Sequence, residues 1–291
     1  MNQNISSSGQ QPLFSREKTT AAIKYSTFNI LPSPVAVWTP ASQKSIHLTA
    51  VQASAPLGVT ITFSSDGNSQ ILSFRLTQSV AAKTLQLPSA YRIAKGNSVF
   101  VRTANEETAC NTFGAATATQ VAFDGRSNFT NVANAVGLAN RQVATLNSTL
   151  LIPTGGRIVL TYNMPAGAVN QLQIKSVIIK YYCRLALILN VGTSTMTLYW
   201  RPTAAVDWLQ LQQVSLSIIG TLDYLTNPLT HDITASVLAS ANPWNVIANL
   251  QTSFTGVHIG LALVNSIQLD AVEVEVCVTG LNKITLFGFE A

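Results

Sequence analysis

Short segments in which apolar and polar residues alternate, separated by turn residues, recur along most of this chain. In DAVEVEVCVTG (residues 270–280), four valines occupy every second position, and glutamate or cysteine stands between them. Successive side chains of a β-strand point to opposite faces, so this segment predicts an antiparallel strand with one buried face. Met196, Leu198 and Trp200 alternate with polar or amphipathic neighbours in the same way. The chain is therefore expected to be all-β.

Residues 59–76 predict a β-hairpin. Apolar residues alternate with Thr and Ser up to Ser64, Asp66 and Gly67 supply a turn, and alternation resumes from Leu72. An Asp-Gly pair readily adopts the positive φ angles of a tight turn. Further β segments at 46–51, 83–87 and 98–103 have the spacing of a sandwich. We expect one antiparallel β-sandwich over residues 23–110.

Residues 111–150 are rich in Ala, Asn, Thr and Gly and alternate little. They are interpreted as a connector with one strand around 120–123 and a short helix near 132–138. A connector of this length is often functional or an interaction surface.

Strand patterns return after residue 150 and predict a second, larger sandwich over residues 151–291. About eight strands in jelly-roll style are expected. The segments are 157–162, 172–189, 195–201, 208–219, 231–238, 257–264 and 270–279. A final strand at 284–289 either closes this sheet or pairs across a subunit boundary.

Residues 1–22 are rich in Ser, Gln and Asn and lack periodicity. This composition is typical of an extended N-terminal arm that becomes ordered on a partner, and equally of a disordered tail. The fold class is thus all-β, with two antiparallel β-sandwich, jelly-roll-like domains and an extended N-terminal arm.

The surface is expected to be uncharged but polar. Charged residues make up 10% of the chain, against about 25% in an average domain. Ser, Thr, Asn and Gln fill roughly a third of it, which indicates buried subunit surface, because charge is depleted at interface cores. A monomer with a Thr-rich β surface is the alternative.

Several partners and environments are excluded by the sequence. The net charge of +5 is scattered, so no basic stripe indicates nucleic-acid binding. The apolar stretch 176–191 is interrupted by Lys180 and Arg184 and is too short for a bilayer. No secretory signal is visible. Cys110, Cys183 and Cys277 are widely spaced and odd in number, so free thiols and assembly in a reducing cytoplasm are expected.

No pattern of catalytic or metal-binding residues is found. His47, His231 and His258 lack metal-ligand spacing, and His258 is expected to face outward between Val257 and Ile259. Neither an enzyme nor a cofactor is predicted. The enzymatic alternative is an unrecognised site on the C-terminal jelly roll, with His231, Asp232 and Glu273 as first suspects.

Aromatic residues are the candidates for a ligand or interface site: Trp244, Trp208 and Tyr199. Exposed rings can stack on sugars, whereas buried rings anchor a core or interface. Trp244, in Asn-Pro-Trp, has the most loop-like surroundings.

The second half resembles a known family. NPWNVIANLQTSFTGVHIGLALV (residues 242–264), followed by DAVEVEVCVTG, is similar to the galactose-binding-like jelly-roll modules of bacteriophage tail and capsid-attached proteins. The positions that carry the resemblance are Trp244, Leu250, Gly256, Ile259 and the valines at 272–278, within a match over residues 155–280. VWTPASQKSIHLTAVQASA (residues 37–55) and GNSVFVRT (96–103) are similar to small sandwiches of phage appendage or decoration modules.

The resemblance implies a bacteriophage virion structural protein: a capsid decoration, or a tail or fibre component. Such proteins form oligomers, often trimers, and attach to other virion proteins through an N-terminal segment. We therefore expect a homo-oligomer in the virion, assembled in the host cytoplasm. The alternative that keeps the fold is a carbohydrate-binding adhesin or receptor-binding module, whose partner is a host-surface glycan. No sugar-binding residue of the family can be carried over to this sequence.

Overall fold

The chain folds into two compact units, Met1–Glu106 with Leu281–Ala291, and Glu107–Gly280. We call these the first and second units, and the second is inserted into the sequence of the first. The computed structural model describes residues 21–28, 33–55, 57–77, 82–104, 108–121, 129–147, 154–164, 172–188, 191–261, 265–280 and 282–291. Most of the predicted N-terminal arm lies outside these residues.

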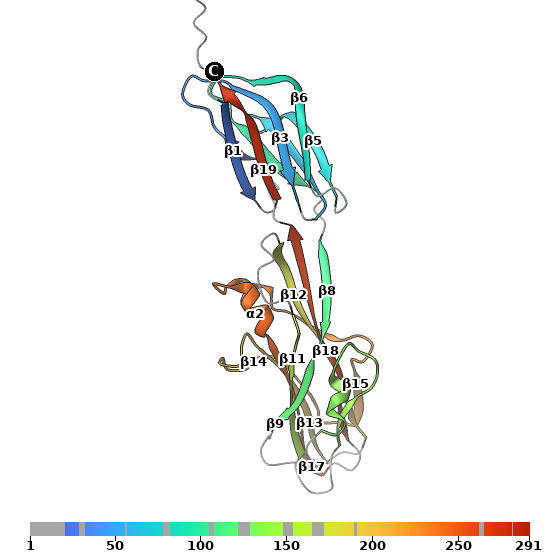
Figure 1. The fold of residues 1–291 in the computed structure, drawn as a ribbon. Coiled ribbons are helices and arrows are strands. Elements are labelled where there is room, and N and C mark those ends of the chain that lie inside the picture. The colour runs from blue at the N-terminus through green and yellow to red at the C-terminus, as the bar shows by residue number, and fades with distance from the viewer. Residues whose placement is uncertain are drawn as a thin grey trace, which may run out of the picture. The chain divides into compact units, whose positions relative to one another are not determined.

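The first unit is a sandwich of two four-stranded antiparallel sheets (Figure 1). One sheet has, in spatial order, β1 (Ala21–Phe28), β19 (Asn282–Glu290), β3 (Ile46–Ser54) and β6 (Ala82–Ile93). The other has β2 (Val35–Trp38), β7 (Val99–Ala104), β4 (Val59–Ser65) and β5 (Ser69–Leu76). The core is formed by apolar side chains of both sheets, with Trp38, Ile46 and Phe63 fully buried.

The predicted hairpin is confirmed as β4 and β5. Asp66 and Gly67 adopt positive φ angles of 54° and 85°. The Asp66 carboxylate accepts hydrogen bonds from the backbone N–H groups of Asn68 and Ser69 at 3.1 and 3.0 Å. These bonds favour the ionised carboxylate and lower the pKa of Asp66.

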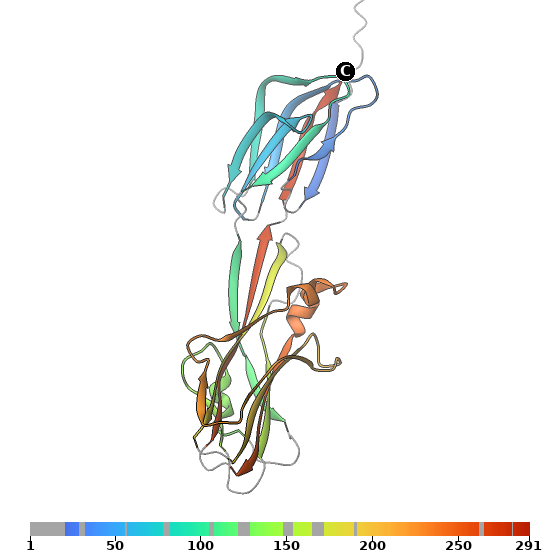
Figure 2. The same cartoon turned by 180° about the vertical axis from the view of Figure 1, so that it is seen from behind.

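The last strand, β19, belongs to the first unit, which corrects the expected domain of residues 151–291. It pairs with β1 on one side and β3 on the other, and Figure 2 shows it beside β1 from behind. Ile284 and Leu286 join the core of the first unit, and the Trp38 indole donates to the Glu290 carboxylate at 2.8 Å. The strand pattern identified β19, but its partners are over 200 residues away and leave no local signal.

The second unit is a jelly-roll-like sandwich of a six-stranded and a five-stranded sheet. In the six-stranded sheet, β18 (Ser266–Gly280) pairs with β8 (Ala109–Gly114), β10 (Ala144–Asn147) and β12 (Leu172–Leu187), and β12 also pairs with β15 (Gly220–Asp223) and β16 (Leu229–Asp232). The five-stranded sheet has the order β14 (Leu209–Leu216), β13 (Val191–Arg201), β17 (Gln251–Leu261), β11 (Thr154–Thr161) and β9 (Thr117–Val121).

The segment expected to be a connector, residues 111–150, is part of the second unit. It contributes β8, β9 and β10 to the sheets, and the 3-10 helix η1 (Val132–Ala135) in place of the expected helix. The carboxylates of Asp270 and Glu273, both buried, accept hydrogen bonds from the backbone N–H groups of Asn140, Arg141 and Ala139. The strand expected around 120–123 overlaps the end of β9, whereas β8 and β10 were not predicted, because both are short edge strands with weak alternation.

Cys110 and Cys277 form a disulfide, which corrects the expectation of free thiols for these two residues. They stand directly opposite each other on β8 and β18, with Cα atoms 4.0 Å apart. A spacing of 167 residues hides such a pair in the sequence. The bond requires oxidising conditions at some stage. Cys183 is a buried free thiol, and burial raises its pKa.

Two α-helices lie among the described residues of the second unit. Residues 231–238, expected to be one strand, divide into β16 and α1 (Thr234–Leu238), and α2 covers Pro243–Asn249. The Asn242 side chain accepts a hydrogen bond from Asn245 N–H at 3.1 Å and caps α2. Among the helices of the described residues, none is long and apolar enough to cross a membrane.

Candidate functional site

Two of the three aromatic candidates, Tyr199 and Trp208, come together on the five-stranded sheet of the second unit. Tyr199 lies on β13, where Met196, Leu198 and Trp200 are buried, so the side chains between them point to the outer face. Trp208 immediately precedes β14, the neighbouring strand. Both rings are partly exposed.

Two arginines stack on these rings. The Arg157 Cζ atom lies 5.3 Å from the centre of the Tyr199 ring and 5.9 Å from that of Trp208. The Arg201 Cζ atom lies 4.1 Å from the centre of the Trp208 ring. A guanidinium within about 6 Å of an aromatic face is attracted by the ring quadrupole. We call these four residues the Arg–aromatic cluster.

Hydrogen bonds along the outer face fix both guanidinium groups. Arg157 Nε donates to Thr255 Oγ1 at 3.1 Å. Arg201 donates from Nε and Nη2 to Gln251 Oε1 at 2.9 and 2.6 Å, and from Nη1 to the Ala204 carbonyl at 3.0 Å. A guanidinium carries five N–H donors, so the three donated bonds of Arg201 leave two for another acceptor. The cluster is therefore a rigid, partly exposed surface that combines ring faces with cationic donors.

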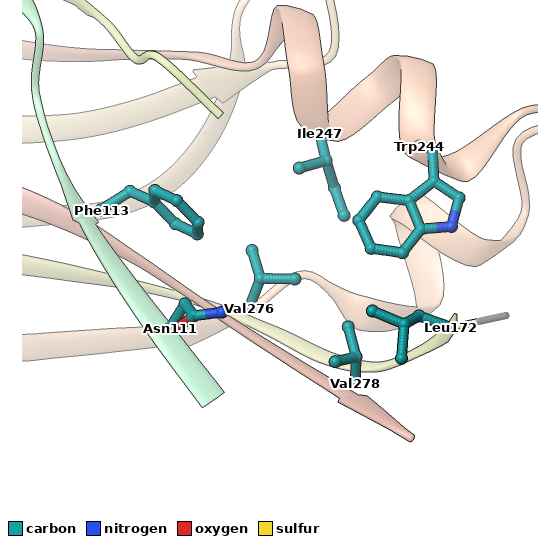
Figure 3. Close-up of a pocket in the computed structure, with 7 residues that line it drawn as sticks. All are labelled: Asn111, Phe113, Leu172, Trp244, Ile247, Val276 and Val278. Atoms are coloured by element: carbon teal, nitrogen blue, oxygen red, sulfur yellow. The ribbon is translucent and has the colours of Figure 1, made fainter. Parts of the chain in front are cut away.

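Trp244 contributes to a different place in the second unit, an apolar cavity of about 210 Å³. Figure 3 shows its six-membered ring pointing toward Ile247, with the indole nitrogen on the far side of the ring from the other lining residues. The lining comes from α2, β8, β12 and β18: Asn111, Phe113, Leu172, Trp244, Ile247, Val276 and Val278. Asn111 is the one polar side chain in this lining, so the cavity suits an apolar group better than a sugar.

The three enzymatic suspects do not converge. His231 on β16 and Glu273 on β18 lie on opposite sides of β12, which pairs with both strands. Asp232 accepts a hydrogen bond from Thr234 N–H at 2.8 Å, and hydrogen bonds from Thr234 lower its pKa. Burial lowers the pKa of His231 and favours its neutral form. In the described part of the chain, no group of three or more His, Cys, Asp and Glu residues could hold a metal ion.

His258 points into the core, which corrects its expected outward orientation. Its side chain is 1% exposed, Nδ1 lies 2.6 Å from Ser194 Oγ, and Nε2 lies 3.4 Å from the Leu146 carbonyl oxygen. A neutral ring with its proton on Nε2 satisfies both contacts. Burial lowers the pKa of His258 and so favours this neutral form. The buried His258 and Ser194 side chains are inaccessible to a substrate, and the contacts of His258 connect β17 with β13 and β10.

Reasoning from the sequence missed Arg157 and Arg201. A signal was present, because Arg201 follows Tyr199 by two positions and therefore shares its face of β13. Arg157 gave no comparable signal, since β11 reaches the cluster only through the pairing of Arg157 with Thr255 on β17.

No family model matches the sequence, and no curated protein matches it. Among solved structures, the chain is similar to one of infectious bursal disease virus, Gt strain, at 12% identity over 96% of this chain and 83% of the other, with a TM-score of 0.19. It is also similar to the N-terminal CBM22-1-CBM22-2 tandem domain of Xyn10C from Paenibacillus barcinonensis, at 8% identity over 91% and 92%, with a TM-score of 0.24. Scores of this size assign no family, and function is inferred from the residues of this chain.

Proposed function

We propose that this chain is a non-enzymatic structural protein of a virus particle, a capsid decoration or a tail or fibre component, which acts by self-assembly and attachment. The observation that carries the proposal is the insertion. The first unit holds both β1 and β19, and the second unit is built entirely between β7 and β19. The first unit is therefore built from segments on both sides of the inserted second unit.

The outer face of the five-stranded sheet supports assembly. Several of its positions are occupied by partly exposed Thr or by exposed Ser and Gln, as in Thr193 and Thr195 of β13 and Gln213 and Ser215 of β14. Uncharged polar groups of this kind can be buried against a partner with hydrogen bonds, whereas burying charges carries a large desolvation cost. Contacts made by such surfaces depend weakly on salt.

The attachment step can be tested by removing the N-terminal segment. Because β1 begins at Ala21, the truncation should stop at residue 20 and leave the first unit intact. The mass by light scattering, and co-assembly with the other structural proteins of the same particle, would be compared with and without residues 1–20. Retention of the fold with loss of assembly supports the proposal. A monomer in both forms that fails to join particles contradicts it.

A second candidate function is glycan binding, and the Arg–aromatic cluster favours it. Tyr199 and Trp208 offer ring edges and faces, and Arg201 has donors suited to a carboxylate, since guanidinium groups bind carboxylates through paired hydrogen bonds. The expected ligand class is an acidic sugar. Binding to a glycan array that Trp208→Ala abolishes and Trp244→Ala preserves would establish this function. A glycan-array signal that survives Trp208→Ala would exclude the Arg–aromatic cluster as the glycan-binding site.

A further inference from the structure

Strand β14 is an edge strand whose free side is unprotected. It pairs with β13 from Ser194 opposite Leu216 to Trp200 opposite Leu209, and no other described strand pairs with it. Its sequence, LQLQQVSL, contains neither a charged residue nor proline. An edge strand with free backbone N–H and C=O groups is a template for pairing with another chain.

Other long edge strands of the described residues carry the usual protection. In the first unit, β1 contains Lys24, β5 contains Arg75, and β6 contains Lys83, Pro88 and Arg92. Charged side chains and proline at sheet edges prevent pairing between molecules. The uncharged edge strands of the second unit other than β14, namely β8, β9 and β10, have six, five and four residues, against eight in β14.

Apolar side chains are exposed at both ends of β14. Leu209, its first residue, is 46% exposed, and Ile218 and Ile219, just after its last residue, are 71% and 64% exposed. Two antiparallel copies of this strand would place Ile218 of each copy near Leu209 of the other. The distribution of exposed apolar groups is thus complementary to itself, which favours a second copy of the same chain as the occupant.

We propose that β14 pairs antiparallel with β14 of a second copy, so that two five-stranded sheets become one continuous sheet across a twofold axis. This inference deepens the proposed assembly function and rests on it. Because the strand is uncharged, its pairing with itself brings no like charges opposite each other. Gln213 and Ser215, both exposed, lie in the central part of the contact.

The test introduces charge at this edge of the full chain. Gln213→Lys with Ser215→Lys would set lysines against lysines across the twofold axis, whereas Thr119→Lys adds a charge to β9, the opposite edge of the same sheet. Mass would be measured by light scattering over a range of protein concentrations. We expect the double variant to dissociate at a concentration at least about tenfold higher than the parent protein, since each lost 1.4 kcal/mol is tenfold, and Thr119→Lys to behave as the parent.

The outcomes separate this inference from the proposed function. A parent protein that is monomeric at every concentration overturns both. A parent oligomer that persists unchanged in the double variant overturns pairing through β14 and leaves assembly through other surfaces. Gln213→Cys gives an independent readout, because oxidation should link two copies near the axis, while Thr119→Cys should give no linked dimer.

Discussion

Removal of the Cys110–Cys277 disulfide should destabilise the second unit strongly. The bond closes a loop with a sequence separation of 167 residues. In the chain-entropy description, a loop of this length restricts the unfolded state by about 5 kcal/mol, and measured disulfides usually contribute 2–4 kcal/mol. Domains have total stabilities of only about 5–15 kcal/mol. Cys110→Ser should therefore lower the melting temperature of the second unit by about 4 to 20 °C, at 2–4 °C per kcal/mol for a domain of this size.

The assay is calorimetry of the full chain under non-reducing conditions. Cys277→Ser and the double variant are matched controls, because each removes the same bond and all three should melt alike. Thiol titration in denaturant should first find one reactive thiol, from Cys183, in the parent protein. Three thiols in the oxidised parent protein, or a double variant that melts with the parent, would refute the reasoning.

Three further predictions concern the second unit. Gly114→Ala should lower the free energy of unfolding by more than about 2 kcal/mol, because a Cβ atom there would lie 2.2 Å from the carbonyl carbon of Gly137. A Cβ atom at Gly220 would meet nothing within 4 Å, so Gly220→Ala should be nearly neutral. Denaturant titrations measure both variants, and equal effects would contradict this reasoning. Burial lowers the pKa of His258 in the folded protein, so its contribution to the free energy of unfolding should be fully present above about pH 6.5 and fall at lower pH by up to about 1.4 kcal/mol per pH unit, because the unfolded state takes up a proton first. The pKa of His231 is lowered in the same way, so His258→Gln should reduce the slope without abolishing it; an unchanged slope would count against the contribution of His258. Residues 107–280 expressed alone should fold, since β8 and β18 pair at the two ends of the segment; a molten product by near-UV circular dichroism would show that it depends on the first unit.

Local alternation predicted the strands that have one buried and one polar face. β4, β5 and β13 follow this pattern, and the Asp66–Gly67 turn between the first two was identifiable from residue type alone. Alternation also identified β18, but both faces of that strand are covered, since Asp270 and Glu273 are buried as well as the valines. These features depend on neighbours within a few positions, which a single sequence displays directly.

The predicted side-chain orientation of His258 was wrong because both faces of its strand are covered. In β17, residues 252–255 are all buried, so a polar residue there does not mark the face of the strand that is exposed to solvent. His258 lies four positions after Phe254 and shares its inward face, a signal that outweighs the apolar character of Val257 and Ile259.

Long-range pairing left no local signal. The partners of β19, the bond between Cys110 and Cys277, and the meeting of Arg157 with Tyr199 all join segments distant in sequence. Of the candidate site, the aromatic residues were predictable by type, whereas their arginine partners depended on strand register.

The most direct test of the central claim is the mass of the full chain by sedimentation equilibrium at about 0.1 and 1 M NaCl, where the Debye length falls from about 10 to 3 Å. Charged residues make up 10% of the chain, so an assembly held by uncharged surfaces should keep its mass at the higher salt. A stable oligomer at both salt concentrations is the predicted result. A monomer at both, or an oligomer that dissociates in high salt, would contradict assembly through uncharged surfaces.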